Sequence, residues 1–415
     1  MATILELSDI ISSRTKLIHD ELQASGRPQP TFDVIQDPDA ITLDGELQQA
    51  QKELRDAAQK LSDLVAGPSN LLLEQLFSFH DPAVMRVLYT FKIPQAVPLT
   101  GSISFDDLSA KVGIEVSRLR RILRYAYSLR IFQEPEPEHV SHTQLSCELA
   151  TAQPSIDMLG HMVDEEYPTG LNLAQALSRW PGESGPTNTA YNIAFETDQP
   201  WFKWIGTEPH RAVRFAGAMG FLSTRGINAI DLMLQRFDWT ANCKTFVDVG
   251  GSRGHVAMAI LRAFPSIQHG LVQDLPEIVA QMPKDAQPAD LEGRLDFAAQ
   301  SFLEPQPVRD ADVYFFRYIF HDYSDAVCVQ ILDNLVPSMR KGSRLVINDF
   351  IVPALGTGCA IDERYTRQMD IHMLEFMASK ERTVDDWREL VESGSKGMLK
   401  LESARVATLS FVKES

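Results

Sequence analysis

The segment that most constrains the fold lies in the C-terminal half, where a strand pattern runs directly into a glycine-rich turn. Residues 245–249 (Thr-Phe-Val-Asp-Val) have the pattern of a buried strand, and Gly-Gly-Ser-Arg-Gly follows at 250–254. A helix is predicted from about 255 to 264, and a second strand at 270–273 ends beside Asp274. A strand, tight turn and helix in this order are typical of a parallel α/β sheet that binds its ligand at the carboxyl ends of the strands.

The spacing of the glycines distinguishes this turn from a dinucleotide site. A dinucleotide fingerprint needs G-x-G-x-x-G, whereas the glycines here are Gly250, Gly251 and Gly254. A pyrophosphate would gain nothing from Asp248, which stands two residues before the first glycine, but the amino group and sulfonium of S-adenosylmethionine would. Asp274 stands at the distance expected for an acid that binds the two ribose hydroxyls. These residues predict S-adenosylmethionine as the cofactor.

The overall composition argues against several other kinds of partner. The 415 residues have a formal net charge of −17, which disfavours a phosphate backbone or an anionic membrane surface. No segment has the pattern of a signal peptide or a membrane span. The cysteines are scattered, without the spacing of a disulfide framework or a metal site: Cys147, Cys243, Cys328 and Cys359. We therefore expect no nucleic acid, membrane or metal partner, and a cytoplasmic location.

Changes of pattern along the chain predict four segments. Residues 1–70 form an N-terminal helical extension, and 71–150 form a helical block that contains a small winged element. Residues 151–240 are mainly helical, and 241–415 alternate short strands with helices, as a parallel α/β domain does. The two amphipathic helices of the extension, the second of which ends at Gly67-Pro68, must cover their apolar faces. They either pack on the rest of the chain or form a dimer interface.

The winged element raises the question of DNA binding. Helices are predicted over 106–112 and 116–129, followed by extended pieces at 131–132 and 140–141. The second helix has four basic side chains: Arg118, Arg120, Arg121 and Arg124. Acidic side chains of the same block offset them: Asp106, Asp107, Glu115, Glu134, Glu136 and Glu138. The arginines are therefore interpreted as a solvated or interface face.

Five ordered motifs give the chain a resemblance to a known family. They are 247–254 (VDVGGSRG), 273–276 (QDLP), 317–325 (RYIFHDYSD), 347–353 (INDFIVP) and 380–383 (KERT). From about residue 70 to 413 the sequence resembles the plant-type and fungal small-molecule O-methyltransferases, the family of caffeate and flavonoid methyltransferases. The resemblance implies a C-terminal Rossmann-like class I methyltransferase domain. It also implies an N-terminal, mainly helical dimerisation domain with a winged-helix element, and a homodimer.

The resemblance also implies a catalytic group built around a histidine. His321 matches the general base of the family, and Asp349 and Glu381 match the carboxylates that flank and orient this base. A phenol loses its proton near pH 10 and an imidazole binds one near pH 6.5, so a held histidine is a workable base. The alternative is that His321 only caps the helix that begins near Ser324. Taken alone, either acid would more often be a surface residue or a salt-bridge partner than part of a catalytic group.

The cofactor site follows from the same resemblance. Besides Asp248 and Gly251, we expect Gly250 and Asp274 to contact the cofactor, with Arg317 as the nearby basic residue. The adenine-binding position departs from the family pattern. Plant members have Gly-Asp-Met-Phe there, whereas this chain has Ala-Gln-Ser-Phe, so that adenine would meet Gln300, Ser301 and Phe302. Gln300 can still donate and accept hydrogen bonds at an adenine edge.

The acceptor pocket is predicted from thioethers and one histidine. Met369, Met373 and Met377 recur every four residues and so share one face of a helix. Core packing would explain this spacing. The resemblance suggests instead that the face, and Met373 in particular, lines a pocket for a flat small aromatic or polyketide-type acceptor. His161 is a further candidate for substrate contact.

Three functions remain open at this stage. Methyl transfer to a hydroxyl of a secondary metabolite is the first. The second comes from fungal relatives that keep the fold and the cofactor but catalyse pericyclic reactions or dehydration, with the sulfonium as a fixed positive charge. Such relatives tend to alter the position of His321, so its presence favours methyl transfer. The third is a non-catalytic protein that binds DNA through the winged element.

Overall fold

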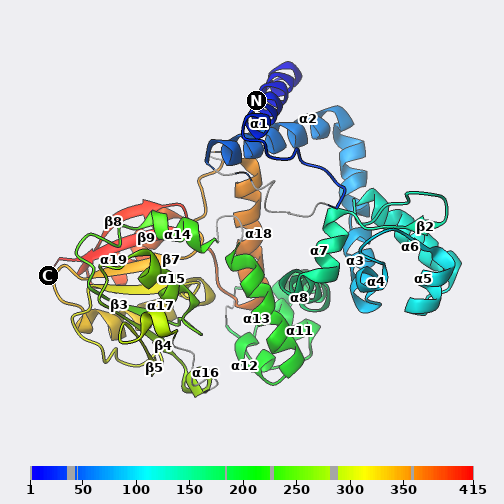
Figure 1. The fold of residues 1–415 in the computed structure, drawn as a ribbon. Helices are drawn as coiled ribbons and strands as arrows, with labels where there is room; N and C mark the ends of the chain where they lie inside the picture. Colours follow the sequence, from blue (N-terminus) through cyan, green and yellow to red (C-terminus); the bar gives the residue numbers. More distant parts are fainter. Residues whose placement is uncertain are drawn as a thin grey trace. The chain divides into compact units, whose positions relative to one another are not determined.

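The computed structural model describes residues 2–34, 43, 45–182, 185–224, 229–280, 288–356 and 359–414. The chain forms two compact units that are interleaved in sequence. The first unit comprises Met1–Pro168, Ile205–Phe221 and Cys359–Asp362, and the second comprises Thr169–Trp204, Leu222–Gly358 and Glu363–Ser415. Figure 1 labels the helices and strands of both units and colours them along the chain.

A seven-stranded sheet in the order β5-β4-β3-β6-β7-β9-β8 forms the centre of the second unit. Its strands are β3 (Thr245–Val249), β4 (His269–Asp274), β5 (Leu295–Ala299), β6 (Val313–Arg317), β7 (Arg344–Asn348), β8 (Leu399–Arg405) and β9 (Thr408–Lys413). The first five are parallel, whereas β9 is antiparallel to both β7 and β8. The order reverses at β3, which lies between β4 and β6, and ligands of open α/β sheets bind at such a switch point.

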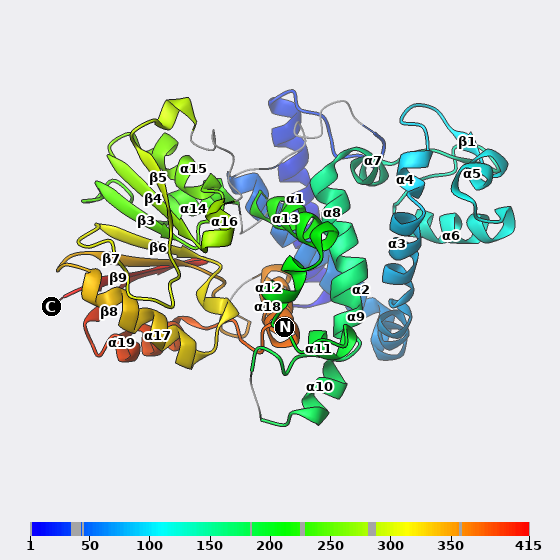
Figure 2. The same ribbon diagram turned by 90° about the horizontal axis from the view of Figure 1, so that it is seen from below.

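Side chains of alternating strand positions fill two cores, one on each face of the sheet. In β6, Tyr314 and Phe316 share a core with residues of α17 (Asp325–Leu335) and α19 (Val384–Gly394), whereas Val313 and Phe315 share the other core with residues of α14 (Ile230–Arg236) and α15 (His255–Ala263). Figure 2 shows α17 and α19 on one face of the sheet and α14 and α15 on the other. This alternation follows from the two-residue repeat of a strand, and each buried Phe stabilises the fold by about 1.5–3 kcal/mol. The helices of this unit are α10 (Leu173–Arg179), α11 (Ala190–Ala194), α12 (Trp201–Gly206), α14 (Ile230–Arg236), α15 (His255–Ala263), α16 (Pro276–Ala280), α17 (Asp325–Leu335), α18 (Ala360–Phe376) and α19 (Val384–Gly394), with 3-10 turns η4 (Ala289–Leu291), η5 (Phe320–Asp322) and η6 (Val336–Ser338).

Helices dominate the first unit. They are α1 (Ile4–Ala24), α2 (Gly45–Phe77), α3 (His80–Thr90), α4 (Ile93–Ala96), α5 (Phe105–Val112), α6 (Val116–Ser128), α7 (Gln144–Thr151), α8 (Gln153–His161), α9 (Tyr167–Gly170) and α13 (Pro209–Ser223), with a π-helical turn η2 (Met162–Glu166). One core lies among α3 to α6, and a smaller one joins α1 to α2. The apolar face of the N-terminal extension is therefore partly covered within the chain itself.

The predicted helix end at Gly67-Pro68 is a break between two helical stretches. Gly67 has φ 72° and ψ 166°, outside the helical region, and Pro68 then opens the second stretch. Proline suits the first turn of a helix because its missing N–H would be unpaired there. The stretch on either side of the break exposes a row of large apolar side chains: Leu64, Val65, Leu72, Leu73, Leu76 and Phe77.

The winged element differs from the prediction in its strands. Helices α5 and α6 are present, but residues 131–132 form no strand, and Phe132 has a positive φ of 65°. The strand β2 (His139–Val140) pairs with β1 (Ile103–Ser104), upstream of α5, and a single antiparallel bridge between Gln133 and Ser141 joins the two predicted extended pieces. The backbone of Ile131 and Phe132 turns sharply because both side chains are buried in the core of this block.

The arginine face of α6 is largely neutralised by the loop that follows it. Arg124 contacts Glu134 at 3.0 Å and Glu138 at 3.1 Å, and Arg120 also pairs with Glu138. Two of the four arginines are therefore engaged by acids of the same block. Among the described helices, none has the length and apolar character to cross a membrane.

Candidate active site

The glycine turn lies at the carboxyl ends of β3 and β4. Gly250 has φ 76°, and its N–H donates to the carbonyl of Gln273 at 2.8 Å. A Cβ at Gly250 would lie 2.5 Å from Cδ1 of Ile319, and one at Gly251 would lie 2.5 Å from Oδ2 of Asp248. Both positions therefore need glycine, which lets a ligand approach the backbone closely.

Asp274 is held in place by the backbone on both sides. Its carboxylate accepts hydrogen bonds from the N–H of Ser252 at 2.7 Å and of Leu275 at 2.8 Å. The side chain is thereby fixed at the edge of the glycine turn, as the ribose-binding prediction requires. Burial raises the pKa of Asp274, although the two N–H donors oppose the shift.

Asp248 provides a test of whether the cofactor fits. It is 2% exposed, and its Oδ2 has no hydrogen-bond partner within the described residues. Burial raises the pKa of Asp248 to about 7, although the positive charge of Arg317 offsets part of the shift. The backbone of Ala257 donates to this carboxylate, but a buried charged oxygen without a partner of its own is costly, and a cationic ligand group would relieve that cost. The site therefore fits the positively charged amino-acid and sulfonium end of S-adenosylmethionine.

The predicted adenine-binding residues form the loop after β5. The backbone N–H of Gln300 donates to the carbonyl of Asp274 at 2.8 Å, and its side-chain amide donates to the carbonyl of Ser301 at 3.0 Å. Phe302 meets the ring of Tyr323 edge-on at 5.6 Å. These contacts place the loop beside Asp274, and part of the hydrogen-bonding capacity of Gln300 serves the loop itself.

His321 lies in the short turn η5, just after β6. Its ring nitrogen Nδ1 is 2.7 Å from Oε1 of Glu381, and its backbone N–H donates to Oδ2 of Asp349 at 3.0 Å. His321, Asp349 and Glu381 are all buried. The structure thus brings together three residues that lie 28 and 60 positions apart in sequence. A carboxylate on Nδ1 fixes the tautomer in which Nε2 accepts a proton.

Asp322, which was not among the predicted site residues, has the carboxylate nearest to that accepting nitrogen. Oδ1 of Asp322 is 3.6 Å from Nε2 of His321, too far for a hydrogen bond but close enough for strong attraction. Burial alone would lower the pKa of His321. The negative charges of Glu381, Asp322 and Asp349 outweigh burial and raise the pKa of His321 to about 10. Asp322 could have been predicted as a site residue because it directly follows His321, and adjacent residues in a tight turn remain close.

The methionine face is only partly helical. Met373 is buried in α18 and Met369 is partly buried, whereas Met377 follows the last residue of the helix. The neighbouring Phe376 packs against Tyr191, with ring centroids 5.9 Å apart. Further aromatic rings surround these two: Phe195, Trp201 and Trp204. An aromatic cluster therefore adjoins Met373, and sequence spacing alone could not join residues 191–204 to α18.

His161 belongs to the first unit, whereas the other predicted site residues belong to the second. Its ring nitrogens lie 3.2 Å from Glu165 and 2.9 Å from Glu166. Burial lowers the pKa of His161, but the hydrogen bonds to the two glutamates raise it to about 9. Arg211 and Arg214 of α13 pair with the same Glu165. His161 is therefore part of a buried ion network, and contact with a substrate stays a prediction.

The fold and this site together define a class I methyltransferase that acts on small molecules. The family comparison agrees: the model described as O-methyltransferase domain matches residues 173–396, and the one described as O-methyltransferase dimerisation domain matches residues 73–152. The chain belongs to the O-methyltransferase family and is an enzyme that depends on S-adenosylmethionine.

Named relatives support this membership along most of the chain. O-methyltransferase aoiF of Aspergillus oryzae is 33% identical over 93% of this chain and 92% of its own length. Chlorophenol O-methyltransferase of Trichoderma longibrachiatum is 31% identical over 99% and 90%. Two solved structures share the fold. OxaC in complex with SAH and oxaline has a TM-score of 0.73 at 21% identity, covering 99% of this chain and all of its own. A pericyclic reaction enzyme has a TM-score of 0.72 at 23% identity, covering 98% and 100%.

Proposed function

We propose that this protein methylates a hydroxyl group of a small aromatic or polyketide-type secondary metabolite, with His321 as the general base. The carrying observation is the buried pair between His321 and Glu381, at 2.7 Å, in a turn at the cofactor edge of the sheet. The named relatives, one of which is a chlorophenol O-methyltransferase, support a phenolic acceptor.

The protein's own residues would move the proton and hold the charge. The acceptor oxygen passes its proton to Nε2 of His321, while Nδ1–H stays hydrogen-bonded to Glu381. The carboxylates of Glu381, Asp322 and Asp349 stabilise the imidazolium that forms. A phenol and His321 both have pKa values of about 10, so this transfer is close to balanced. S-adenosylmethionine, when bound, supplies a methyl group activated by its positively charged sulfur. Asp248, Asp274 and the glycine turn would hold it.

The test is incubation of the purified protein with S-adenosylmethionine and a panel of phenols, naphthols and hydroxylated polyketides. The expected product is heavier by one methyl group, with S-adenosylhomocysteine formed in equal amount. The chain also has the fold of a pericyclic reaction enzyme. An isomerised or dehydrated product without cofactor consumption would therefore replace this proposal with that alternative.

We further propose a homodimer formed through the N-terminal region. The dimerisation-domain match at 73–152 and the exposed apolar row on α2 support it. Light scattering after size exclusion should give twice the 46.5 kDa chain mass, and a monomer would contradict the proposal. A cytosolic location is proposed because all four cysteines are unpaired, and cell fractionation tests it.

A further inference from the structure

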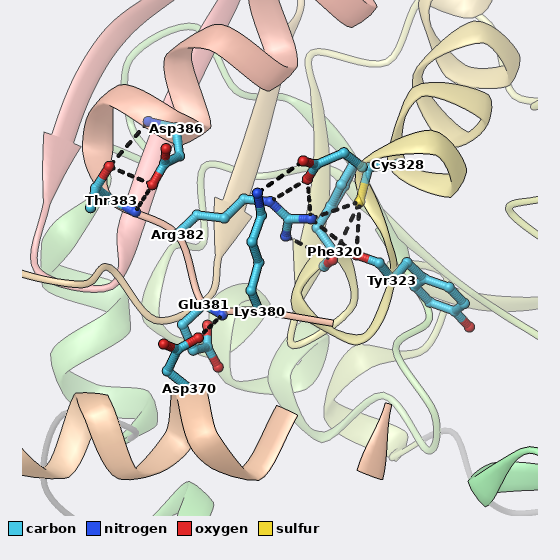
Figure 3. Close-up of polar contacts among 10 residues, drawn as sticks. Phe320, Tyr323, Cys328, Asp370, Lys380, Glu381, Arg382, Thr383 and Asp386 are labelled. Carbon is cyan, nitrogen blue, oxygen red and sulfur yellow. Dashed lines mark hydrogen bonds and ion pairs between the residues drawn. The ribbon is translucent and has the colours of Figure 1, made fainter. Parts of the chain in front are cut away.

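Arg382 is a fully buried cation beside the turn that contains His321. It is 1% exposed, and its guanidinium donates to the carbonyl of Phe320 at 3.2 Å and to the carbonyl of Tyr323 at 3.0 Å (Figure 3). Its Nη2 also lies 2.6 Å from Oδ1 of Asp325, and the guanidinium carbon lies 5.0 Å from the ring centre of Trp387. Arg382 is thus fixed from several sides.

The two carbonyls that Arg382 binds bracket His321 and Asp322. One belongs to the residue before His321 and the other to the residue after Asp322, so one planar group fixes both ends of the turn. Cys328 supports the same carbonyls, with its Sγ 3.4 Å from the oxygen of Phe320 and 3.5 Å from that of Tyr323. A guanidinium has donors in a rigid fork and can bind two such acceptors at once.

The residue before Arg382 holds the ring of the same histidine. Glu381 accepts from Nδ1 of His321, and its own N–H is anchored on Asp370 of α18 at 2.9 Å (Figure 3). Ser379 adds a hydrogen bond from its hydroxyl to the carbonyl of His321 at 2.5 Å. Glu381 therefore binds the ring of His321, Ser379 binds its carbonyl, and Arg382 binds the two carbonyls that bracket the turn.

A surface ion pair does not account for this arrangement. Asp325 is the carboxylate partner of Arg382, but its side chain is 52% exposed and also pairs with Lys380 at 2.9 Å. Only the Lys380–Asp325 pair has both partners exposed, and such a pair contributes little to stability. The buried hydrogen bonds to the carbonyls of Phe320 and Tyr323 are the contacts that require a guanidinium at this position.

We propose that Arg382 is a positioning residue for the general base: it aligns the His321 turn so that the ring meets both Glu381 and the acceptor hydroxyl. This role rests on the proposed function of His321. Arg382 acts through His321, because its contacts are with the backbone of the turn, Asp325, Cys328 and Trp387. Since lysine keeps the charge but presents a single compact ammonium, Arg382→Lys removes the alignment and not the electrostatic field.

The experiment compares Arg382→Lys with Lys380→Met. The control removes the other cation on Asp325, which donates to neither carbonyl of the turn. We expect Arg382→Lys to lower kcat roughly 10- to 100-fold, because a misplacement near 1 Å costs about that much, with the Kd for S-adenosylmethionine changed less than about twofold. Lys380→Met should keep both values.

The pH profile separates alignment from simple loss of folded protein. In Arg382→Lys, the midpoint of the alkaline rise in kcat should move to lower pH, because His321 pairs less well with Glu381. Loss of folded protein would scale kcat equally at every pH. An unchanged midpoint, or a kcat within about twofold of wild type, would overturn the proposal.

A second readout does not depend on methyl transfer. Nitrogen-15 NMR of the histidine rings, with the His321 signal identified by its loss in His321→Asn, should show titration at lower pH in Arg382→Lys than in wild type. If wild type methylates no acceptor, the proposed function fails while this comparison still decides the positioning role. If Arg382→Lys does not fold, Asp325→Asn replaces it. A smaller shift in the same direction is then expected, and an unshifted His321 would refute the proposal.

Discussion

The buried carboxylate of Asp248 should make the ligand-free protein less stable than a variant without it. Its Oδ2 has no hydrogen-bond partner among the described residues, and burial raises its pKa from 3.8 to about 7. An acid whose folded pKa is above its unfolded value opposes folding once it is ionised. The destabilisation is absent below the unfolded pKa, grows as the pH rises between the two values, and is complete above about pH 7.

The size of the effect follows from that shift. At about 1.4 kcal/mol for each pKa unit, the ionised form of Asp248 lowers the free energy of unfolding by about 4 kcal/mol. Asn in the same place would bury an amide whose hydrogen bonds are incomplete, at a cost of about 1–3 kcal/mol. Asp248→Asn should therefore raise the free energy of unfolding by about 1–3 kcal/mol at pH 8. At pH 4, where folded Asp248 is protonated, the gain should disappear and the variant should be the less stable protein by up to about 1–3 kcal/mol.

Urea denaturation of the ligand-free protein at both pH values measures this difference, with the exposed Asp9→Asn as the matched control. Saturating S-adenosylmethionine should reverse the order, because a ligand present at a hundred times its Kd stabilises wild type by about 2.7 kcal/mol. A variant that is less stable at pH 8, or whose stability differs from wild type equally at both pH values, would refute the reasoning.

Further predictions concern the cofactor site, the general base and the pH dependence of kcat. Asp274→Ala should raise the Kd for S-adenosylmethionine in calorimetry. Gly251→Ala should abolish binding, because its Cβ would lie 2.5 Å from Oδ2 of Asp248. Unchanged affinity in either variant would contradict the assigned site. His321→Ala should abolish turnover with cofactor affinity intact, and Glu381→Gln should lower kcat by about 10²-fold; near-normal kinetics would remove His321 as the base. Because protonated His321 cannot accept a proton and its pKa is about 10, kcat should rise from pH 7 towards pH 10, and a flat profile would count against the assignment.

Local patterns predicted the elements around the cofactor well. The strand at 245–249, the glycine turn and the helix after it lie within about one residue of their predicted bounds. Each is specified by a continuous run of side chains, and the parallel sheet follows from their alternation. The predictions of the family and the cofactor, both confirmed, also depended on short continuous motifs.

Apart from the carboxylates beside His321, which the family resemblance implied, contacts between distant segments could not be predicted from the sequence. No separate role was predicted for Arg382 within the motif at 380–383, because its two carbonyl partners lie 59 and 62 positions away in sequence. For a similar reason, the extended piece predicted around 131–132 forms no strand, and a single bridge between Gln133 and Ser141 takes its place. Residues 139–140 pair with 103–104 upstream, a choice made by the packing of the whole helical block.

The interleaving of the two units limits how this chain can be divided. Glu165 is almost completely buried, and its partners Arg211 and Arg214 come from a helix some 50 residues further on, beyond a segment that belongs to the other unit. A fragment cut at residue 168 would leave that carboxylate buried without either arginine. Removing one partner of a buried charge pair typically costs about 3–5 kcal/mol, a large part of a domain's total stability. The first unit should therefore fold only together with residues 205–221. Recombination between relatives is then expected to exchange the two stretches together.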